Sequence, residues 1–226
     1  MSTATLTRSS RTHRLDQAAG ALLVLGGVTF VAGGITHPGD SGEGSKVSQL
    51  HEMLVDSMWY PSHALMLASF ACIAGAIVGV RMRIDLGAGM TRLLNVVATV
   101  AVVATVGMVF HLIAATNAEA IADGEKNVMY HVQEVVETGG DTLWGLAIVA
   151  LALAGGLTRT LGNRLTIAFG VVGGLAFSLA SATIAFTDRF DPLFPVGSLI
   201  GIWAVAVGLM TIGRKASGSA TPETRA

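Results

Sequence analysis

Histidine is the residue type in this chain whose placement points most directly to chemistry. His63 and His111 each lie near one end of a long apolar segment. Because a helix rises about 1.5 Å per residue, two such imidazoles can reach similar depths on antiparallel helices. Paired imidazoles at one depth can bind haem b axially or form half of a transition-metal site. We therefore predict His63 and His111 as the cofactor ligands.

Other residues could complete a metal site beside this pair. His37, His51 and His131 map to the same end of the predicted topology, and Glu134 follows His131 by three residues. At that spacing a carboxylate can share a metal with the imidazole or orient it. These four residues are the predicted metal ligands. The alternative is that an amphipathic imidazole near a helix end binds nothing.

Methionine is a further candidate ligand, because thioether and imidazole together favour copper. No Met-x-x-Met cluster occurs in the chain, and methionine is also a common filler of apolar gaps. Haem therefore ranks ahead of copper. The methionines on the histidine side are Met53, Met58, Met66, Met108 and Met129.

Composition indicates that these residues are positioned by membrane helices. Hydrophobic residues make up 52% of the 226 positions and charged residues 13%, about half the charged fraction of a soluble domain. Each long apolar run approaches the roughly 20 residues that cross a bilayer, and lipid requires such runs to be helical. We predict an all-α, polytopic bundle of six transmembrane helices. The runs lie at 17–36, 61–80, 93–116, 142–158, 165–187 and 193–213.

The charged loops predict the orientation of the bundle. Of fourteen Lys and Arg residues, all except Lys46, Lys126 and Arg189 fall on the side shared by the two termini. Basic residues accumulate on the cytoplasmic side, so we predict a multi-pass cell-membrane protein with both termini cytoplasmic. A cleavable signal peptide is the competing interpretation of the first run, which is longer than a usual signal core. The predicted parts are a basic tail 1–15, a membrane domain 16–213 and a disordered tail 214–226.

The segments between the spans add three expectations. Helical spacing of apolar residues in 46–59 and 127–137 predicts short amphipathic helices on the outer face. Asp141 and Trp144 look like interfacial anchors of the fourth span. Glycines four apart on one helical face favour close helix packing within the bundle, or a homo-oligomer or membrane partner. The pairs are Gly75 with Gly79, Gly170 with Gly174, and Gly197 with Gly201.

Absences in the sequence narrow the function classes. The single cysteine, Cys72, excludes an internal disulfide and a cysteine-based zinc site. No P-loop, G-x-S-x-G or H-E-x-x-H motif is present, and a net charge of −1 provides no basic field for nucleic acid. No Asp, Glu, Lys or Arg is expected in the middle of a span, which disfavours ion-coupled transport.

Three interpretations remain, and they leave open whether the protein is an enzyme. The first is a membrane oxidoreductase or electron-transfer protein that holds haem or a metal at its histidines. The second is a small-solute transporter or channel, with a path lined by polar residues of the spans. The third is a non-catalytic subunit that assembles with a partner in the lipid bilayer. The path residues of the second interpretation would be Asn95, Ser178, Ser181 and Thr183.

Overall fold

The structure is a computed structural model that describes residues 3–83 and 86–214, with side chains from Thr12 onward. All regular elements in these ranges are helical, which confirms the predicted all-α class. Six helical segments in the described part are long and apolar enough to cross a membrane, as predicted. Their main helices are α1 (Thr3–Ile35), α3 (Trp59–Arg81), α4 (Ala88–Ile113), α7 (Asp141–Leu157), α8 (Arg164–Thr183) and α10 (Leu199–Ile212).

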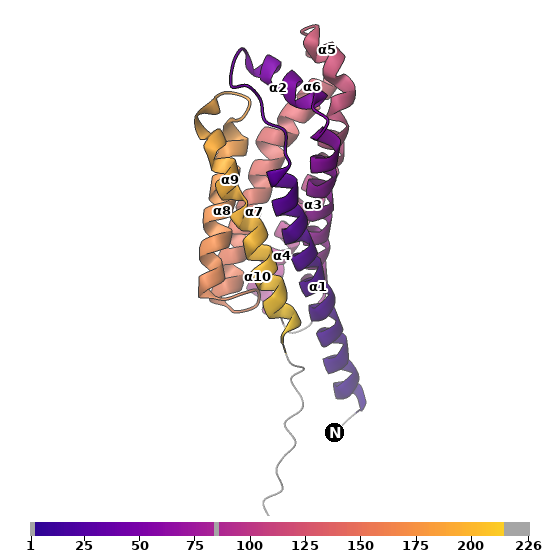
Figure 1. The fold of residues 1–226 in the computed structure, drawn as a ribbon. Helices are drawn as coiled ribbons and strands as arrows, with labels where there is room; N and C mark the ends of the chain where they lie inside the picture. Colours follow the sequence, from indigo (N-terminus) through magenta and orange to yellow (C-terminus); the bar gives the residue numbers. More distant parts are fainter. Residues whose placement is uncertain (1–2, 84–85, 215–226) are drawn as a thin grey trace, which may run out of the picture.

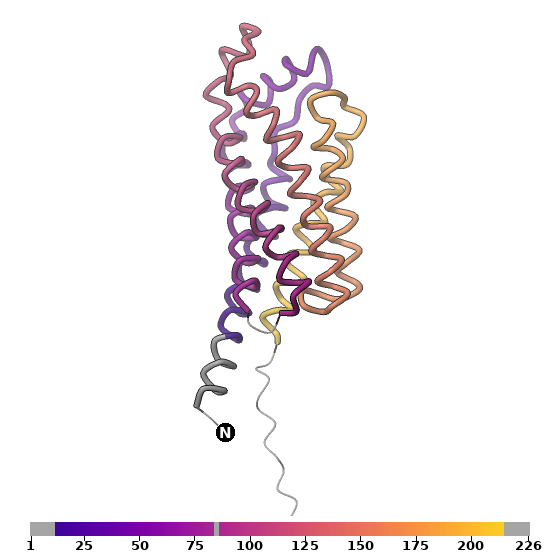
Figure 2. Tube along the Cα trace, turned by 180° about the vertical axis from the view of Figure 1, so that it is seen from behind, coloured from indigo at the N-terminus to yellow at the C-terminus, as the bar shows by residue number. Residues whose placement is uncertain are grey.

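Shorter helices complete the fold at the end of the bundle opposite the end of α10 (Figures 1 and 2). We call this the histidine end, because His37, His63 and His111 lie there. The opposite end, where α7 and α10 finish and α8 begins, is called the arginine end. The shorter elements are α2 (Lys46–Val55), the 3₁₀ helix η1 (Ala114–Asn117), α5 (Ala118–Ala122), α6 (Val128–Val135), the π-helical turn η2 (Val136–Gly140), the 3₁₀ helix η3 (Asp188–Leu193) and α9 (Phe194–Gly197).

The six main helices form a closed ring in chain order. Each packs against the next, and α10 returns to pack against α1 (Figure 1). Aromatic rings fill the centre: Trp144 from α7 stacks on Phe70 from α3, with ring centroids 4.1 Å apart, and on Phe30 from α1 at 5.5 Å. Large apolar rings facing one another explain why helices from both halves of the chain enclose a single core.

Trp144 and Asp141 therefore do not anchor the fourth span at an interface, as the sequence had indicated. Trp144 is fully buried and Asp141 is 8% exposed. The reason is that the fourth span begins at Val128 rather than at residue 142, so both residues lie well inside it. The second predicted outer helix exists as α6, but it continues through η2 into α7 instead of lying separately on the surface. The first predicted outer helix is α2.

Glycine contacts hold neighbouring helices together. A Cβ added to Gly201 of α10 would lie 2.7 Å from the carbonyl oxygen of Gly27 in α1, and one added to Gly208 would lie 2.6 Å from that of Gly20. The backbones of α1 and α10 thus touch along two turns, which is the approach that small residues permit in lipid. Helices α7 and α8 do the same through Gly145.

The predicted glycine pairs face other helices of this chain. Gly170 and Gly174 of α8 meet α7, whereas Gly197 and Gly201 meet Phe177 and α1. On α3, Gly75 and Gly79 face α1 at ordinary van der Waals distances. Close packing inside the bundle accounts for all three pairs. An oligomer or membrane partner through these faces stays a prediction.

The structure describes most of the predicted N-terminal tail but little of the predicted C-terminal tail. Helix α1 begins at Thr3, so most of the basic segment 1–15 is helical and continuous with the first membrane-length segment, which begins at Thr12. The predicted C-terminal tail 214–226, apart from Arg214, lies outside the described residues.

Candidate metal centre

Three histidines meet at the histidine end: one lies just after α1, one in α3 and one in α4. One ring nitrogen from each of His37, His63 and His111 lies within 4.8 Å of the other two. His63 is the middle member, with its ring centroid 4.7 Å from that of His37 and 4.6 Å from that of His111. His63 is fully buried, His111 is 6% exposed and His37 is half-buried. The structure therefore brings the two predicted cofactor ligands together with one predicted metal ligand.

The end of α1 places His37. The last helical residue is Ile35, and Pro38 then prevents the helix from continuing past the histidine. The Nδ1 atom of His37 lies 2.8 Å from the carbonyl oxygen of Pro38, to which it donates a hydrogen bond. This bond leaves Nε2 with a free lone pair. Burial lowers the pKa of His37, so the imidazole is held neutral, which is the form that binds metals.

The first turns of α3 hold His63 on both sides. Its Nδ1 atom donates a hydrogen bond of 2.7 Å to the carbonyl oxygen of Trp59, and the Trp59 indole stacks on the imidazole with centroids 3.8 Å apart. The indole is itself fixed, because its Nε1 donates to the carbonyl oxygen of Leu112 at 3.1 Å. The Nε2 atom of His63 is buried without a hydrogen-bond partner among the described residues. Such an unpartnered polar atom is costly unless it binds something.

A carboxylate stands behind His111. Oε1 of Glu137 lies 3.4 Å from Nδ1 of His111, and the Gln133 side chain donates a hydrogen bond of 3.0 Å to the same oxygen. Only 14% of the Glu137 side chain is exposed. A carboxylate in this position fixes the tautomer of a metal-binding imidazole and raises its basicity. Glu137 therefore occupies the Nδ1 side of His111 and leaves Nε2 as the nitrogen that can bind a metal.

The π-helical turn η2 explains how Glu137 comes to face inward. A π turn carries an extra residue, so it rotates the side chains before it relative to those after it, and such turns are frequent at functional sites. The sequence analysis did not single out Glu137 and favoured Glu134 instead. One signal was present: Gln133, Glu137 and Asp141 are spaced four apart and lead into an apolar helix.

The expectation that no carboxylate lies inside a span is wrong for the fourth span. Val128–Leu157 is one membrane-length segment, and it contains both Glu137 and the buried Asp141. Oδ1 of Asp141 has no hydrogen-bond partner among the residues that the structure describes. Buried carboxylates within a span are usually functional.

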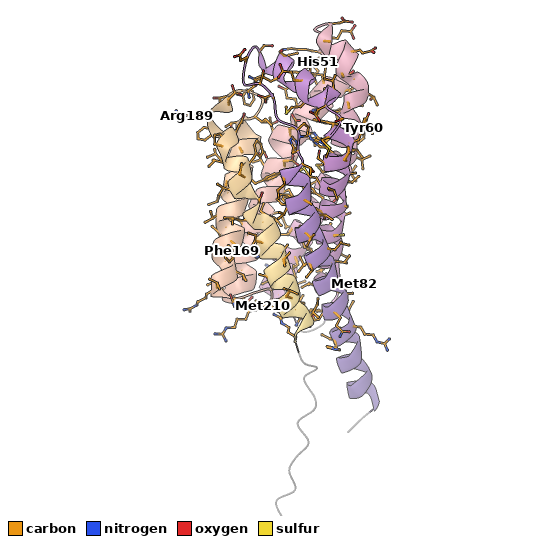
Figure 3. All side chains as sticks on the ribbon, viewed as in Figure 1. His51, Tyr60, Met82, Phe169, Arg189 and Met210 are labelled. Carbon is orange, nitrogen blue, oxygen red and sulfur yellow. The ribbon has the colours of Figure 1, made fainter. Side chains whose placement is uncertain are left out.

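The remaining predicted ligands lie apart from the three-histidine cluster. The His131 side chain is 60% exposed on α6, and its Nδ1 lies 3.5 Å from Oε2 of Glu134. The predicted His–Glu pair thus forms, but on the surface. His51 lies on α2 near the top of the molecule (Figure 3). Metal binding by His51, His131 or Glu134 stays a prediction.

A small apolar cluster lies next to the three histidines and contacts their rings through Trp59. Leu54 of α2 packs with Trp59, and with Ala118 and Ile121 of α5, in a small hydrophobic cluster of its own. Lys46 at the start of α2 forms ion pairs with Asp188 and Asp191, and so ties α2 to η3. Burial opposes the charge of Lys46, but the two aspartates raise its pKa overall.

Three of the polar residues that could line a transport path form hydrogen bonds within the bundle, and a transport path stays a prediction. Ser178 of α8 donates a hydrogen bond of 3.0 Å to the carbonyl oxygen of Thr142, whose hydroxyl donates back to the carbonyl oxygen of Ser178 at 3.2 Å. Thr183 donates to its own helix, at the carbonyl oxygen of Leu179. Asn95 is exposed on α4 and accepts a hydrogen bond from Arg81.

Comparison of the chain with protein-family models, with curated proteins and with solved structures gave no match. The molecule is thus defined by its own features: a six-helix membrane bundle with three histidines gathered at one end.

Proposed function

We propose that this protein is a membrane metalloprotein that binds one transition-metal ion through His37, His63 and His111. The observation that carries the proposal is the buried, unpartnered Nε2 of His63, in a group whose ligand nitrogens lie within 4.8 Å of one another. Bonds from imidazole nitrogen to such ions are about 2.0–2.1 Å long, so nitrogens at these separations need only small shifts to share one ion.

The chemistry of the donors supports zinc or copper. Neutral imidazole suits both ions, and a set of three histidines leaves a fourth position for water or a substrate. Zinc has no redox chemistry, whereas copper would permit the electron transfer or oxidoreductase activity that we predict from the sequence. The identity of the ion therefore decides between Lewis-acid and redox function.

A single ion fits the cluster better than haem b. Two axial imidazoles lie on opposite faces of a porphyrin, with the whole macrocycle between them. The rings of His63 and His111 are instead 4.6 Å apart, and the ring of His37 lies 4.7 Å from that of His63. The Trp59 indole, stacked on His63, occupies further space around the pair.

The test is metal analysis of detergent-purified protein, with absorption and electron paramagnetic resonance spectra of the same sample. We expect about one zinc or copper ion per chain, consistent with a single three-ligand site. His63→Ala should reduce the metal content to background, whereas His131→Ala removes an exposed histidine at the same end and should leave it unchanged.

Circular dichroism and size-exclusion chromatography must show that both variants keep the fold. A protein without metal that also fails to take up Zn²⁺ or copper ions in titration would overturn the proposal. A Soret band in the spectrum would show that the site binds haem rather than a single metal ion. Equal metal loss in His63→Ala and His131→Ala would also contradict the proposed ligand set.

A further inference from the structure

The arginine end carries a second concave site, independent of the histidines. A groove there is lined by the turn that joins α7 to α8 and by the end of α10. Met210, on the groove wall, marks its position near the lower end of the bundle in Figure 3. The lining includes Arg159, Asn163, Arg164, Leu165, Met210 and Arg214.

Two of these arginines occupy positions that the backbone does not favour. Arg159 has φ of 57°, the single positive value at a non-glycine residue in the described ranges. This left-handed position after a helix is usually filled by glycine. Arg164 is the first residue of α8, where the helix dipole disfavours a cation and where no acidic residue balances it. Residues that conflict with the local backbone preference in this way tend to lie at functional sites.

The turn that presents these side chains is well ordered by hydrogen bonds. Asn163 caps α8 by accepting from the backbone N–H groups of Leu165 and Thr166. Arg214 of the α10 end donates a bond of 2.7 Å to the carbonyl oxygen of Arg159. Arg159 and Arg164 are both exposed on this platform. The groove therefore offers two guanidinium groups that extend from a hydrogen-bonded backbone.

The surroundings of the groove are apolar. Leu165 is 69% exposed, Leu157 at the end of α7 is 65% exposed, and Met210 is 38% exposed. Three membrane-length segments start or finish here, so the groove lies at the level of the lipid headgroups. Guanidinium groups bind phosphate through paired hydrogen bonds, and exposed apolar side chains beside them suit acyl chains. A free phosphate ion would use only the charged half of this surface.

We propose that the groove binds the phosphate of an anionic phospholipid such as phosphatidylglycerol. Basic pockets between membrane helices are known to bind such headgroups. The lipid lies between the α7–α8 turn and the end of α10, with its phosphate on Arg159 and Arg164 and its chains against Leu165 and Met210. The bound lipid would also neutralise the unbalanced cation at the start of α8.

The experiment is native mass spectrometry of the protein released from nanodiscs that contain equal amounts of phosphatidylglycerol and phosphatidylcholine. The wild-type protein should retain phosphatidylglycerol in preference to phosphatidylcholine. Loss of a contacting arginine should reduce retention about fivefold per residue, so the double variant R159Q/R164Q should retain almost none. R92Q removes an exposed arginine near the start of α4, outside the groove, and should retain lipid like the wild type.

One variant separates lipid binding from folding. R159G removes the guanidinium but suits the left-handed backbone and keeps the carbonyl that Arg214 contacts. It should therefore unfold at the same temperature as the wild type or higher, yet retain about fivefold less lipid. Equal retention by R159G and wild type, or no preference between the two lipids, would overturn the proposal. Displacement of the lipid by millimolar inorganic phosphate would overturn it in favour of a free-anion site.

Discussion

The two ends of this bundle gather nitrogen-bearing side chains in opposite ways. At the histidine end the imidazoles are mostly buried, and Nδ1 of His37 and His63 is held by backbone carbonyls while that of His111 faces a carboxylate. At the arginine end the side chains of Arg159 and Arg164 are exposed, and hydrogen bonds fix the backbone beneath them. Neutral imidazole can be buried at modest cost, whereas guanidinium is always charged and must stay near water.

Because of this difference, the two ends suit different kinds of ligand. A mostly buried group of neutral imidazoles suits a metal ion, and its geometry depends on the partners that hold each ring. An exposed cationic groove at the headgroup level suits a large anion that arrives with the bilayer. The glycine contacts of α1 with α10 and of α7 with α8 are shared by both ends. Three predictions test whether the ends are independent apart from that scaffold.

The largest effect is expected from the scaffold itself. Gly201→Ala places a Cβ 2.7 Å from the carbonyl oxygen of Gly27 and 2.6 Å from the Val31 side chain. Overpacking of this kind should lower the free energy of unfolding by about 1–3 kcal/mol. Thermal unfolding in detergent measures it, and both metal and lipid retention should fall together.

Gly34→Ala is the matched control on α1, because the nearest atom to its new Cβ is the Ser198 hydroxyl at 3.7 Å. Alanine is the better helix former by up to about 1 kcal/mol, so this variant should be neutral or slightly stabilised. Similar unfolding temperatures for both variants would show that the α1–α10 contact is not tight.

An intermediate effect, confined to one end, is expected from Glu137→Gln. The change removes the charge behind His111 while preserving the shape and the partner Gln133. Loss of such a supporting carboxylate should weaken metal affinity about 10–100-fold, with lipid retention at the arginine end unchanged. Competition with a chelator of known affinity measures the change. Glu134→Gln alters the exposed pair on α6, and an equal loss of affinity there would contradict a specific role for Glu137.

The smallest effect concerns the loop that follows His37. The backbone N–H of Ser41 donates to Glu52 at 2.8 Å and its hydroxyl donates at 3.1 Å, and these bonds lower the pKa of Glu52. The pKa of Glu52 is lower in the folded protein than in the unfolded chain. The stabilisation of the fold by these bonds is therefore complete above the ordinary pKa of a glutamate, and it is lost as the pH falls through the lowered value.

The protection factors of residues 39–45 in the metal-free protein, which compare the exchange rate with the intrinsic rate at each pH, should therefore fall below about pH 4. Glu52→Gln should show the faster exchange already at neutral pH, whereas Glu43→Gln, in the same loop, should behave like the wild type. Protection factors that do not change with pH in the wild type would mean that the Ser41 contact does not restrain the loop.

Much of the site was predictable, and the misses have one physical origin. His63 and His111 stood out because polar residues inside apolar runs need a partner, and their depths followed from the helical rise. Glu137 and Asp141 were missed because the start of the fourth span was placed near residue 142. Apolar content alone does not reveal that a partly polar segment, 128–141, lies inside a membrane-length helix.

The sequence by itself determined the properties that belong to single segments of the chain. Run length and backbone hydrogen bonding required helices, and the spacing of apolar runs predicted six spans with five histidines toward one end. Only the tertiary structure decided which of those histidines meet. His37, His63 and His111 converge because α1, α3 and α4 are neighbours in the ring, and Glu137 joins them because η2 rotates it inward. Helix order and rotation arise from side-chain packing between distant segments, which is a property of the folded bundle rather than of any single stretch of chain.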